Sequence, residues 1–169
     1  RNIFGEAFIL LGSGGNGKST LINLIGALLG TENVSSLSLS ELGDRFKTGL
    51  LANKLANLGD DIPYKAIQNT DVFKKLTTGD GVMGEFKGET PFFFRSYAKL
   101  IFSSNKLPQI FDNSTGLKDR LVIVPLKARV RESVKEDLFI EDKITTKEAL
   151  SYLLNIGLDA LRGLLQKQK

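Results

Sequence analysis

Short, uninterrupted apolar runs recur along the chain and predict the buried strands of a sheet. Such runs lie at residues 7–11, 54–59, 99–104 and 121–125. After the first run, apolar residues recur at helical spacing as far as Leu29, and Gly30 is a plausible helix C-cap. Strands that alternate with helices are typical of an α/β protein, here with a mainly parallel central sheet flanked by helices.

Two weaker patterns lie between the strand-like runs. Residues 31–40 are rich in serine with alternating leucines, which predicts a loop and a short strand at Leu37 and Leu39. Ser40 is then placed to cap a helix that extends through Phe46. A further helix is predicted to begin at Thr70, with an apolar face made by Val72, Phe73 and Leu76.

Residues 82–94 are predicted to form a β-hairpin. Two strand-like segments flank a tip at residues 87–89, which presents Lys87. Pro91 suits an edge strand because proline lacks a backbone N–H, so the hairpin is expected to project from the sheet. Successive strand residues point to opposite faces, and the three phenylalanines at 92–94 therefore cannot all face the same way.

The C-terminal part of the chain has a different character. Charges of both signs dominate residues 127–147, which predicts a solvated surface or a linker. Thr145 and Glu148 have the spacing of a capping box, and leucines at helical spacing follow them. We therefore expect a core at residues 1–131 and, at residues 132–169, a C-terminal helical segment that docks on the core or on a partner.

Composition narrows the class of protein. With 169 residues, 41% of them hydrophobic and 25% charged, the chain suits one domain with a substantial core. It has no Cys and no His, which excludes disulfides, the usual zinc sites and Ser-His or Cys-His nucleophile pairs. A net charge of +4 favours nucleic acid binding only weakly. No run is long and apolar enough to cross a bilayer, so we expect a cytoplasmic protein with no membrane partner.

The stretch after the first predicted strand carries the clearest chemistry. It reads Gly12-Ser13-Gly14-Gly15-Asn16-Gly17-Lys18-Ser19-Thr20 and fits the pattern of a phosphate-binding loop, which we call the phosphate loop. Its glycines let backbone N–H groups turn toward phosphate oxygens, Lys18 reaches the β- and γ-phosphates, and the Ser19 hydroxyl ligates Mg²⁺. The helix that begins near Lys18 adds the positive end of its dipole. The expected nucleotide-binding residues are Gly12, Gly14, Gly15, Asn16, Gly17, Lys18, Ser19 and Thr20.

Two acidic residues, Asp60 and Asp61, follow the second predicted strand, and Pro63 prevents that strand from continuing. Paired carboxylates at a strand end complement a phosphate loop, because one holds Mg²⁺ and the other orients the attacking water. We assign Asp60 to the metal and Asp61 to the base, although the reverse order fits equally well. A solvated Asp-Asp turn is the alternative interpretation.

The last two strand-like runs each have a candidate at one end. Asn105 follows the run at 99–104 and can hold the lytic water beside the γ-phosphate, although asparagine after a strand is commonly a turn former. Arg120 precedes the run at 121–125, where it can reach the edge of the domain and face the nucleotide of a neighbouring subunit. A surface arginine paired with a carboxylate is the alternative.

The order of these parts resembles the superfamily 3 helicase domain of phage and plasmid primase-helicases, including the poxvirus-type proteins. The runs from Phe73 to Asp80 and from Ala98 to Pro108 look like that family's stretch from its B′ motif to its motif C. The resemblance covers roughly residues 7–127. It implies a P-loop ATPase with an AAA+-like core that binds ATP and Mg²⁺ and moves on single-stranded DNA during replication as a homo-hexameric ring.

The resemblance also implies roles for single residues. Asn105 would be the sensor that positions water, and Arg120 would be the finger that reaches the next subunit's γ-phosphate in trans. Lys87 would grip DNA, with Lys74 and Lys75 as further DNA-binding candidates. The chain departs from many members of the family, which carry a glutamate among the acids at this strand end. The chain does not begin with Met, and we expect it to be a piece of a longer protein whose primase region and linker are absent here.

Two other classes of protein also use a phosphate loop. One is a packaging or initiator-type ATPase, against which the lysine-tipped hairpin between the paired acids and Asn105 argues. The other is a small-molecule kinase, which requires a lid with clustered arginines and an acceptor pocket. The sequence has no such arginine cluster.

Overall fold

The computed structural model describes residues 4–59, 70–107, 115–131 and 136–167. Its centre is a five-stranded sheet with the order β2-β3-β6-β1-β7, in which all neighbouring strands run parallel. The predicted α/β fold with a mainly parallel sheet is therefore confirmed. The strands of this sheet are β1 (Ala7–Leu11), β2 (Val34–Ser35), β3 (Ala56–Gly59), β6 (Lys99–Ser104) and β7 (Leu121–Pro125).

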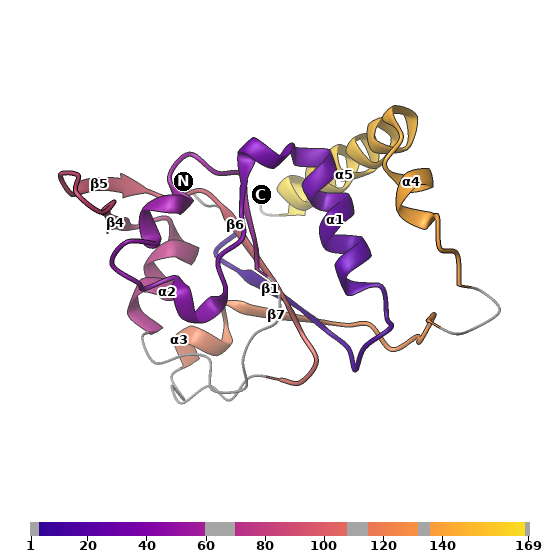
Figure 1. Cartoon of the computed structure of the whole chain (residues 1–169), viewed down its shortest axis with the longest axis horizontal. Helices are drawn as coiled ribbons and strands as arrows, with labels where there is room; N and C mark the ends of the chain where they lie inside the picture. The colour runs from indigo at the N-terminus through magenta and orange to yellow at the C-terminus, as the bar shows by residue number, and fades with distance from the viewer. Residues whose placement is uncertain (1–3, 60–69, 108–114, 132–135, 168–169) are drawn as a thin grey trace.

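Helices flank the central strands. Figure 1 shows α1, α4 and α5 gathered to one side of the strands, with α2 and α3 on the other. The α-helices are α1 (Lys18–Leu29), α2 (Thr70–Thr78), α3 (Thr115–Lys118), α4 (Ile140–Ile144) and α5 (Lys147–Lys167). Short 3₁₀ turns lie at η1 (Thr31–Asn33), η2 (Leu39–Glu41) and η3 (Thr48–Leu51).

The register of β1 decides where the phosphate loop lies. Leu11 at the end of β1 pairs with Ser104 in β6 and with Pro125 in β7. Because parallel strands end at the same edge of a sheet, the residues that follow β1, β6 and β7 come together there. We call this the carboxyl edge of the sheet.

The core contains apolar side chains from the strands, from α2 and α3, and from the segment between β2 and β3. Its members are Ala7, Ile9, Leu37, Leu39, Leu42, Leu51, Phe73, Leu76, Val82, Ala98, Leu100, Phe102 and Leu117. A buried amide, Asn57 in β3, holds that segment in place. Its Oδ1 accepts hydrogen bonds from Ser35 Oγ and Leu37 N, both at 2.9 Å, and its Nδ2 donates to Leu37 O at 2.8 Å. The side chain is thereby satisfied in the interior.

Gly59 ends β3 at a point of very close packing. A Cβ atom here would lie 2.4 Å from the Leu37 carbonyl oxygen and 2.5 Å from the Phe102 ring. No larger residue fits without moving backbone, so glycine at this position lets the end of β3 approach its neighbours.

The predicted hairpin is present. Strands β4 (Gly81–Gly84) and β5 (Phe92–Arg95) form a two-stranded antiparallel sheet separate from the central one. The rings of Phe92 and Phe94 lie 5.6 Å apart, whereas Phe93 is 66% exposed, so the three phenylalanines do face different ways. Figure 1 shows the hairpin projecting at the end of the molecule opposite α4 and α5. At its base, the Arg45 guanidinium donates to both carboxylate oxygens of Glu85 at 2.6 and 2.9 Å.

The segment before β3 differs from the prediction. The short strand is β2 at Val34–Ser35, and the leucines at 37 and 39 are instead buried in the core. Ser38, not Ser40, is the capping residue, because its backbone N–H and its hydroxyl both donate to the Glu41 carboxylate at 2.8 Å. The single 3₁₀ turn η2 follows this cap, where a helix through Phe46 was expected.

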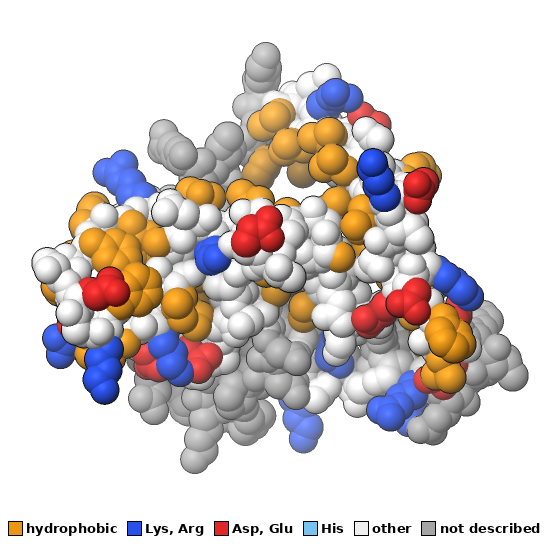
Figure 2. Space-filling view, turned by 45° about the horizontal axis from the view of Figure 1, so that its top comes forward, with side chains coloured by type: hydrophobic (Ala, Val, Ile, Leu, Met, Phe, Trp, Pro, Cys, Tyr) orange, Lys and Arg blue, Asp and Glu red, His pale blue; other side chains and the backbone are white. Residues whose placement is uncertain are grey.

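The C-terminal elements also correct two predictions. β7 is an edge strand and not a core strand, and its Val122 and Ile123 are each 37% exposed. Thr146, not Thr145, caps α5, since its Oγ accepts the Ala149 N–H at 3.2 Å, while Thr145 Oγ donates to Glu141 O at the end of α4. The predicted amphipathic helix is present, but none of its described side chains is buried. Figure 2 shows apolar side chains gathered at this exposed end of the molecule.

Candidate functional site

The phosphate loop folds as a turn that only glycine-rich sequences favour. Gly14, Gly15 and Gly17 have positive φ angles of 108°, 64° and 79°, in the left-handed region where residues with a side chain are strained. Gly17 is the N-cap of α1, so the helix begins at Lys18 and its first N–H groups lie at the loop. The predicted strand, loop and helix therefore follow one another as the phosphate-loop pattern requires.

Lys18 is the charged residue at the centre of this loop. Its side chain is buried, and Nζ donates to the Gly12 carbonyl oxygen at 2.7 Å and to Asn105 Oδ1 at 3.1 Å. The register of β1 and β6 explains this contact, because both residues follow strands that end at the carboxyl edge. Two of the predicted site residues, far apart in the sequence, are thus brought within hydrogen-bond distance.

The chain that follows β7, including the start of the charged stretch at residues 127–147, lies against the phosphate loop. We call residues 126–131 the strap. Its Leu126 N–H donates to Leu11 O at 2.7 Å, and the Val130 and Arg131 N–H groups both donate to Gly15 O, at 2.8 and 3.2 Å. The side chains of residues 127–131 are exposed, as the prediction of a solvated surface at residues 127–147 requires, but the backbone contact with the phosphate loop was not predicted.

The side chain of Asn16, in the phosphate loop, also holds the strap in place. Its Nδ2 donates to the Ala128 carbonyl oxygen at 2.9 Å, and the residue is buried. Arg131 packs so closely on Gly15 that a Cβ added there would lie 2.8 Å from the Arg131 Cβ. This contact could have been predicted from the topology of the sheet. A segment that follows β7, a strand parallel to β1, must leave the sheet at the same edge as the phosphate loop.

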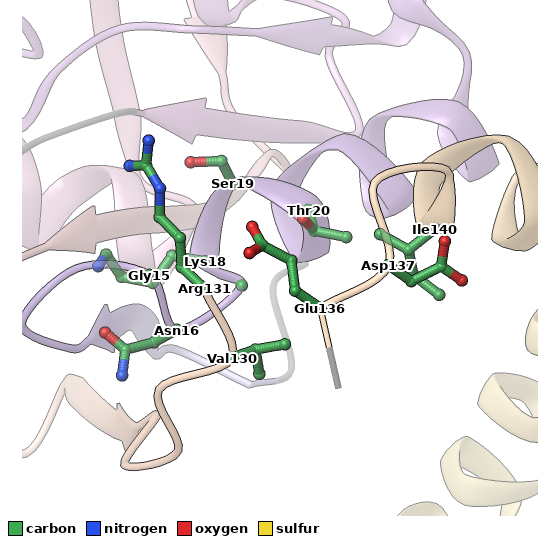
Figure 3. Close-up of a pocket in the computed structure, with 11 residues that line it drawn as sticks. Gly15, Asn16, Lys18, Ser19, Thr20, Val130, Arg131, Glu136, Asp137 and Ile140 are labelled. Atoms are coloured by element: carbon green, nitrogen blue, oxygen red, sulfur yellow. The ribbon is translucent and has the colours of Figure 1, made fainter. Parts of the chain in front are cut away.

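A cavity of about 520 Å³ lies between the phosphate loop and the segment that follows β7. Figure 3 shows the loop residues and the start of α1 facing Val130, Arg131, Glu136 and Asp137 across this space. The cavity is lined by Gly15, Asn16, Gly17, Lys18, Ser19, Thr20, Val130, Arg131, Glu136, Asp137 and Ile140. Its size is that of a small-molecule site.

Asp137, which lines this cavity, stabilises the chain just before α4. Its Oδ2 accepts a hydrogen bond from Lys143 Nζ at 2.6 Å, and its Oδ1 accepts the Phe139 N–H at 3.0 Å. These contacts, that with Lys143 first, hold the pKa of Asp137 below its ordinary value. The carboxylate therefore stays ionised and organises the chain at the entry to α4, which contacts α1.

The paired acids predicted to hold magnesium and activate water, Asp60 and Asp61, lie outside the described residues. β3 ends at Gly59, which pairs with Phe102 in β6. Among the residues that the structure describes, no group of three or more acidic, Cys or His side chains gathers as a metal site. Ser19 is exposed and lines the cavity.

Arg120 lies at the opposite end of the sheet. It directly precedes Leu121, which pairs with Ala7 at the start of β1, so about 16 Å of strand separates it from the phosphate loop. Its guanidinium donates to the Gly116 carbonyl within the same turn of chain. The structure therefore does not bring Arg120 to the cavity of its own chain.

The three candidate DNA-binding lysines also lie away from the cavity. Lys87 is exposed at the tip of the β4–β5 hairpin, Lys75 is exposed on α2, and Lys74 is half-buried there. Lys75 and hairpin residues such as Met83 and Phe93 line a common groove. The hairpin and α2 thus present basic and apolar side chains together, and Figure 2 shows such side chains side by side at that end of the molecule.

The family described as "Family of unknown function (DUF5906)" matches residues 10–120, from the end of β1 to the start of β7. The chain belongs to the DUF5906 family. The match includes the phosphate loop, Asn105 and the hairpin. No curated protein matches this DUF5906 chain.

Solved structures resemble the DUF5906 fold over most of its length. The apo structure of the NrS-1 C-terminal region has a TM-score of 0.69 and 19% identity, covering 88% of this chain and 36% of that one. A JCV helicase structure has a TM-score of 0.62 and 18% identity, covering 90% of this chain and 45% of that one. At these identities the likeness shows only that the chain shares its fold with these structures, and the chain spans less than half of either one.

Among the helices in the described ranges, none combines the length and the apolar character that a membrane span requires.

Proposed function

We propose that this chain is the ATP-hydrolysing domain of a superfamily 3 DNA helicase from a phage or plasmid primase-helicase. The observation that carries the proposal is the contact of Lys18 with Gly12 and Asn105. A cation and an amide in contact beside a phosphate loop are the groups that ATP hydrolysis needs at the γ-phosphate, and this supports the proposal. The likeness of the fold to JCV helicase and to the NrS-1 C-terminal region supports the same class of protein.

The chemistry proposed is phosphoryl transfer from ATP to water. Lys18 and the backbone N–H groups at the start of α1 neutralise and position the phosphates, and Ser19 supplies a hydroxyl ligand to Mg²⁺. Mg²⁺ needs few protein ligands because it keeps waters and nucleotide phosphates, so an exposed serine hydroxyl fits this task. Asn105 orients the attacking water, and Asp60 and Asp61 supply the metal contact and the base.

The remaining parts act between subunits and on DNA. Arg120 lies about 16 Å of strand away from its own phosphate loop, so an arginine finger at this position has to serve a neighbouring subunit. Such a finger raises the hydrolysis rate by about 10³ to 10⁵. We infer a homo-hexameric ring with Lys87 directed to single-stranded DNA, assisted by Lys74 and Lys75, and a primase region elsewhere in a longer cytoplasmic protein.

The most direct experiment measures ATP hydrolysis with and without single-stranded DNA, together with the mass of the protein in solution. We expect slow turnover for the monomer, faster turnover for the assembled ring, and further stimulation by DNA. Turnover that depends on neither protein concentration nor DNA would contradict the helicase proposal while leaving a P-loop ATPase.

The trans role of Arg120 has its own test. Arg120→Ala and Lys18→Ala proteins should each be inactive, because one lacks the finger and the other lacks a competent phosphate loop. In mixed rings, the intact Arg120 of a Lys18→Ala subunit can serve the site of an Arg120→Ala neighbour. Partial recovery of turnover on mixing is expected, and no recovery at any ratio would count against an arginine acting in trans.

A further inference from the structure

The outward side of the β4–β5 hairpin carries two large apolar side chains that are open to solvent. Phe93 is 66% exposed and Met83 is 59% exposed. The two residues pair directly across the strands, so their side chains lie on the same side of this two-stranded sheet. Together with Val72 and Lys75 of α2, they line a groove of about 580 Å³. Exposed apolar side chains that gather in a groove mark a binding surface.

Gly81 gives the Phe93 ring a defined place on this surface. A Cβ atom added at Gly81 would lie 2.5 and 2.6 Å from the two Cε atoms of the ring, so the ring occupies the space that a larger residue would fill. The distal end of the ring therefore rests on the backbone of β4, while much of the side chain stays in solvent. An aromatic ring that is both held and accessible can stack on a flat ligand with little further loss of side-chain entropy.

The chain that follows Phe93 alternates between exposed and covered residues. Phe93, Arg95 and Tyr97 are exposed, whereas the residues between them are buried or half-buried. Side chains two positions apart in an extended chain lie on the same side. The hairpin and its exit therefore present an aromatic ring, a guanidinium and a second aromatic ring in succession.

The positive charges on this surface are available to a ligand. In the part of the chain that the structure describes, neither Lys75 nor Arg95 makes an ion pair. The carboxylate among the groove residues belongs to Glu85, and both of its oxygens already accept hydrogen bonds from Arg45. The groove therefore keeps the uncompensated charge of Lys75 beside its apolar side chains.

This combination fits single-stranded DNA better than it fits an apolar protein surface. Bases supply flat faces for aromatic rings, and the phosphates between them supply partners for cations. An apolar protein surface would cover the rings, but it would also bury Lys75 and Arg95 without an opposite charge, which is costly.

We propose that the outward side of the β4–β5 hairpin is a base-stacking surface for single-stranded DNA. Phe93 and Tyr97 stack on bases, and Lys75 and Arg95 contact phosphates. This inference rests on the proposed helicase function and adds a contact with the bases, whereas Lys87 at the hairpin tip offers only a charge. Because every base has a flat face, the contact tolerates any sequence.

The experiment compares the affinities of the wild-type protein for two single-stranded oligonucleotides of the same length by fluorescence anisotropy. One is intact, and several central nucleotides of the other lack their bases. Both carry the same phosphate charge, so a difference measures contact with bases. We expect the intact strand to bind about tenfold more tightly, and this ratio should persist as salt is raised because stacking involves no ion pair.

Equal affinities would overturn the base-stacking surface and leave a helicase that holds DNA through phosphates alone. If neither oligonucleotide binds, the DNA-binding part of the proposed function fails, and this surface fails with it.

A variant locates the preference in Phe93. Phe93→Leu keeps an apolar side chain over Gly81 but has no aromatic face, so the tenfold preference should fall to about twofold or less. Its affinity for the strand without bases should be unchanged, which also shows that the variant is folded. Phe93→Tyr should retain the preference. Phe139→Leu is the matched control, because Phe139 is 67% exposed at the start of α4, and it should also retain the preference.

The other use of an exposed apolar surface is a contact between copies of this chain. In that case Phe93→Leu would lower the mass of the protein in solution without DNA and would keep the full preference for the intact strand. That pair of results would overturn the proposal, as would full preference in Phe93→Leu alone.

Discussion

The carboxyl edge of the sheet and the β4–β5 hairpin place their lysines in opposite environments. At the edge, Lys18 is 8% exposed, and its ammonium donates to oxygen atoms of Gly12 and Asn105, which follow two different strands. At the hairpin, Lys87 is exposed on the tip of a two-stranded sheet. The first environment holds a positive charge at a fixed position. The second leaves a positive charge exposed, where it can contact a ligand in several positions.

This difference matches what each ligand requires. Phosphoryl transfer depends on reacting groups held at fixed distances, and an error of about 1 Å can cost about 100-fold in rate. Contact with a nucleic acid backbone depends on charge and tolerates movement along the strand. Substitutions at the edge should therefore abolish an activity, whereas substitutions at the hairpin should weaken a salt-dependent affinity.

Lys18→Ala is expected to have the largest effect. Loss of the buried ammonium removes the principal cation that the loop offers to the phosphates, and hydrolysis should fall by about 10² to 10³-fold or more. Steady-state ATPase assays measure this, with Lys147→Ala, an exposed lysine at the start of α5, as the matched control. Turnover near the wild-type rate in Lys18→Ala would refute the site.

Asn105→Ala should separate catalysis from binding at the same edge. We expect hydrolysis to fall by about 10 to 100-fold, because the amide beside the γ-phosphate no longer orients water or Lys18, while the Kd for ATP changes less than about threefold. The exposed Asn155 of α5 provides an Asn→Ala control. Unchanged turnover at saturating ATP together with a weaker affinity for ATP would show that Asn105 contributes only to binding.

Lys87→Ala should leave the structure and activity of the site at the carboxyl edge unchanged and should weaken only the contact with DNA. Basal ATPase activity is expected to stay at the wild-type value, while affinity for single-stranded DNA falls several-fold at low salt. The slope of log affinity against log salt should decrease by about 0.7 if one phosphate contact is lost. The Lys147→Ala control should keep the full slope, and a drop in basal turnover in Lys87→Ala would contradict the separation of the two regions.

The smallest predicted effect concerns the stability contributed by the contact of Lys47 with Glu41. The hydrogen bond from Lys47, followed by those from Ser38, lowers the pKa of Glu41 from 4.5 to about 2. A carboxylate with a depressed pKa stabilises the folded state above its ordinary pKa, and that contribution disappears as the pH falls from 4.5 toward 2.

Glu41→Gln should therefore cost less than about 1 kcal/mol at pH 7 and almost nothing near pH 2. Urea unfolding of both proteins between pH 2 and 7 measures this difference. Glu89→Gln, on the exposed hairpin tip, serves as the matched control. Parallel stability curves for wild type and Glu41→Gln would rule out the contribution of this contact.

The predicted features that the structure contains are those with a local pattern. The strand runs, the glycines of the phosphate loop and the lysine-tipped hairpin all follow from side-chain types at short spacing. The strap was missed because Gly15 O and the N–H groups of Val130 and Arg131 are backbone atoms that every such residue carries. Asn57 was missed for a related reason, since a polar residue in a strand does not reveal which distant carbonyl and N–H it will satisfy.

The position of Arg120 could be predicted only in part. Its place before a strand is a local feature, but its distance from the phosphate loop depends on the parallel register of β7 with β1. The helix expected between Ser40 and Phe46 does not form, because other contacts of this segment favour a different backbone conformation. The Ser38–Glu41 cap and the burial of Leu37 and Leu39 favour a compact turn over helical propensity.

The parallel pairing of β1 also has a consequence for how the chain folds. β1 pairs only with β6 and β7, whose residues come more than 90 positions later in the chain. Contacts of such high sequence separation form late, because the long intervening chain must first be ordered. A nascent chain that has emerged only as far as Ala98 contains every residue of the phosphate loop but neither neighbouring strand. Nucleotide binding therefore requires the complete sheet, so the affinity for a nucleotide can be measured as a probe of whether the whole core has folded.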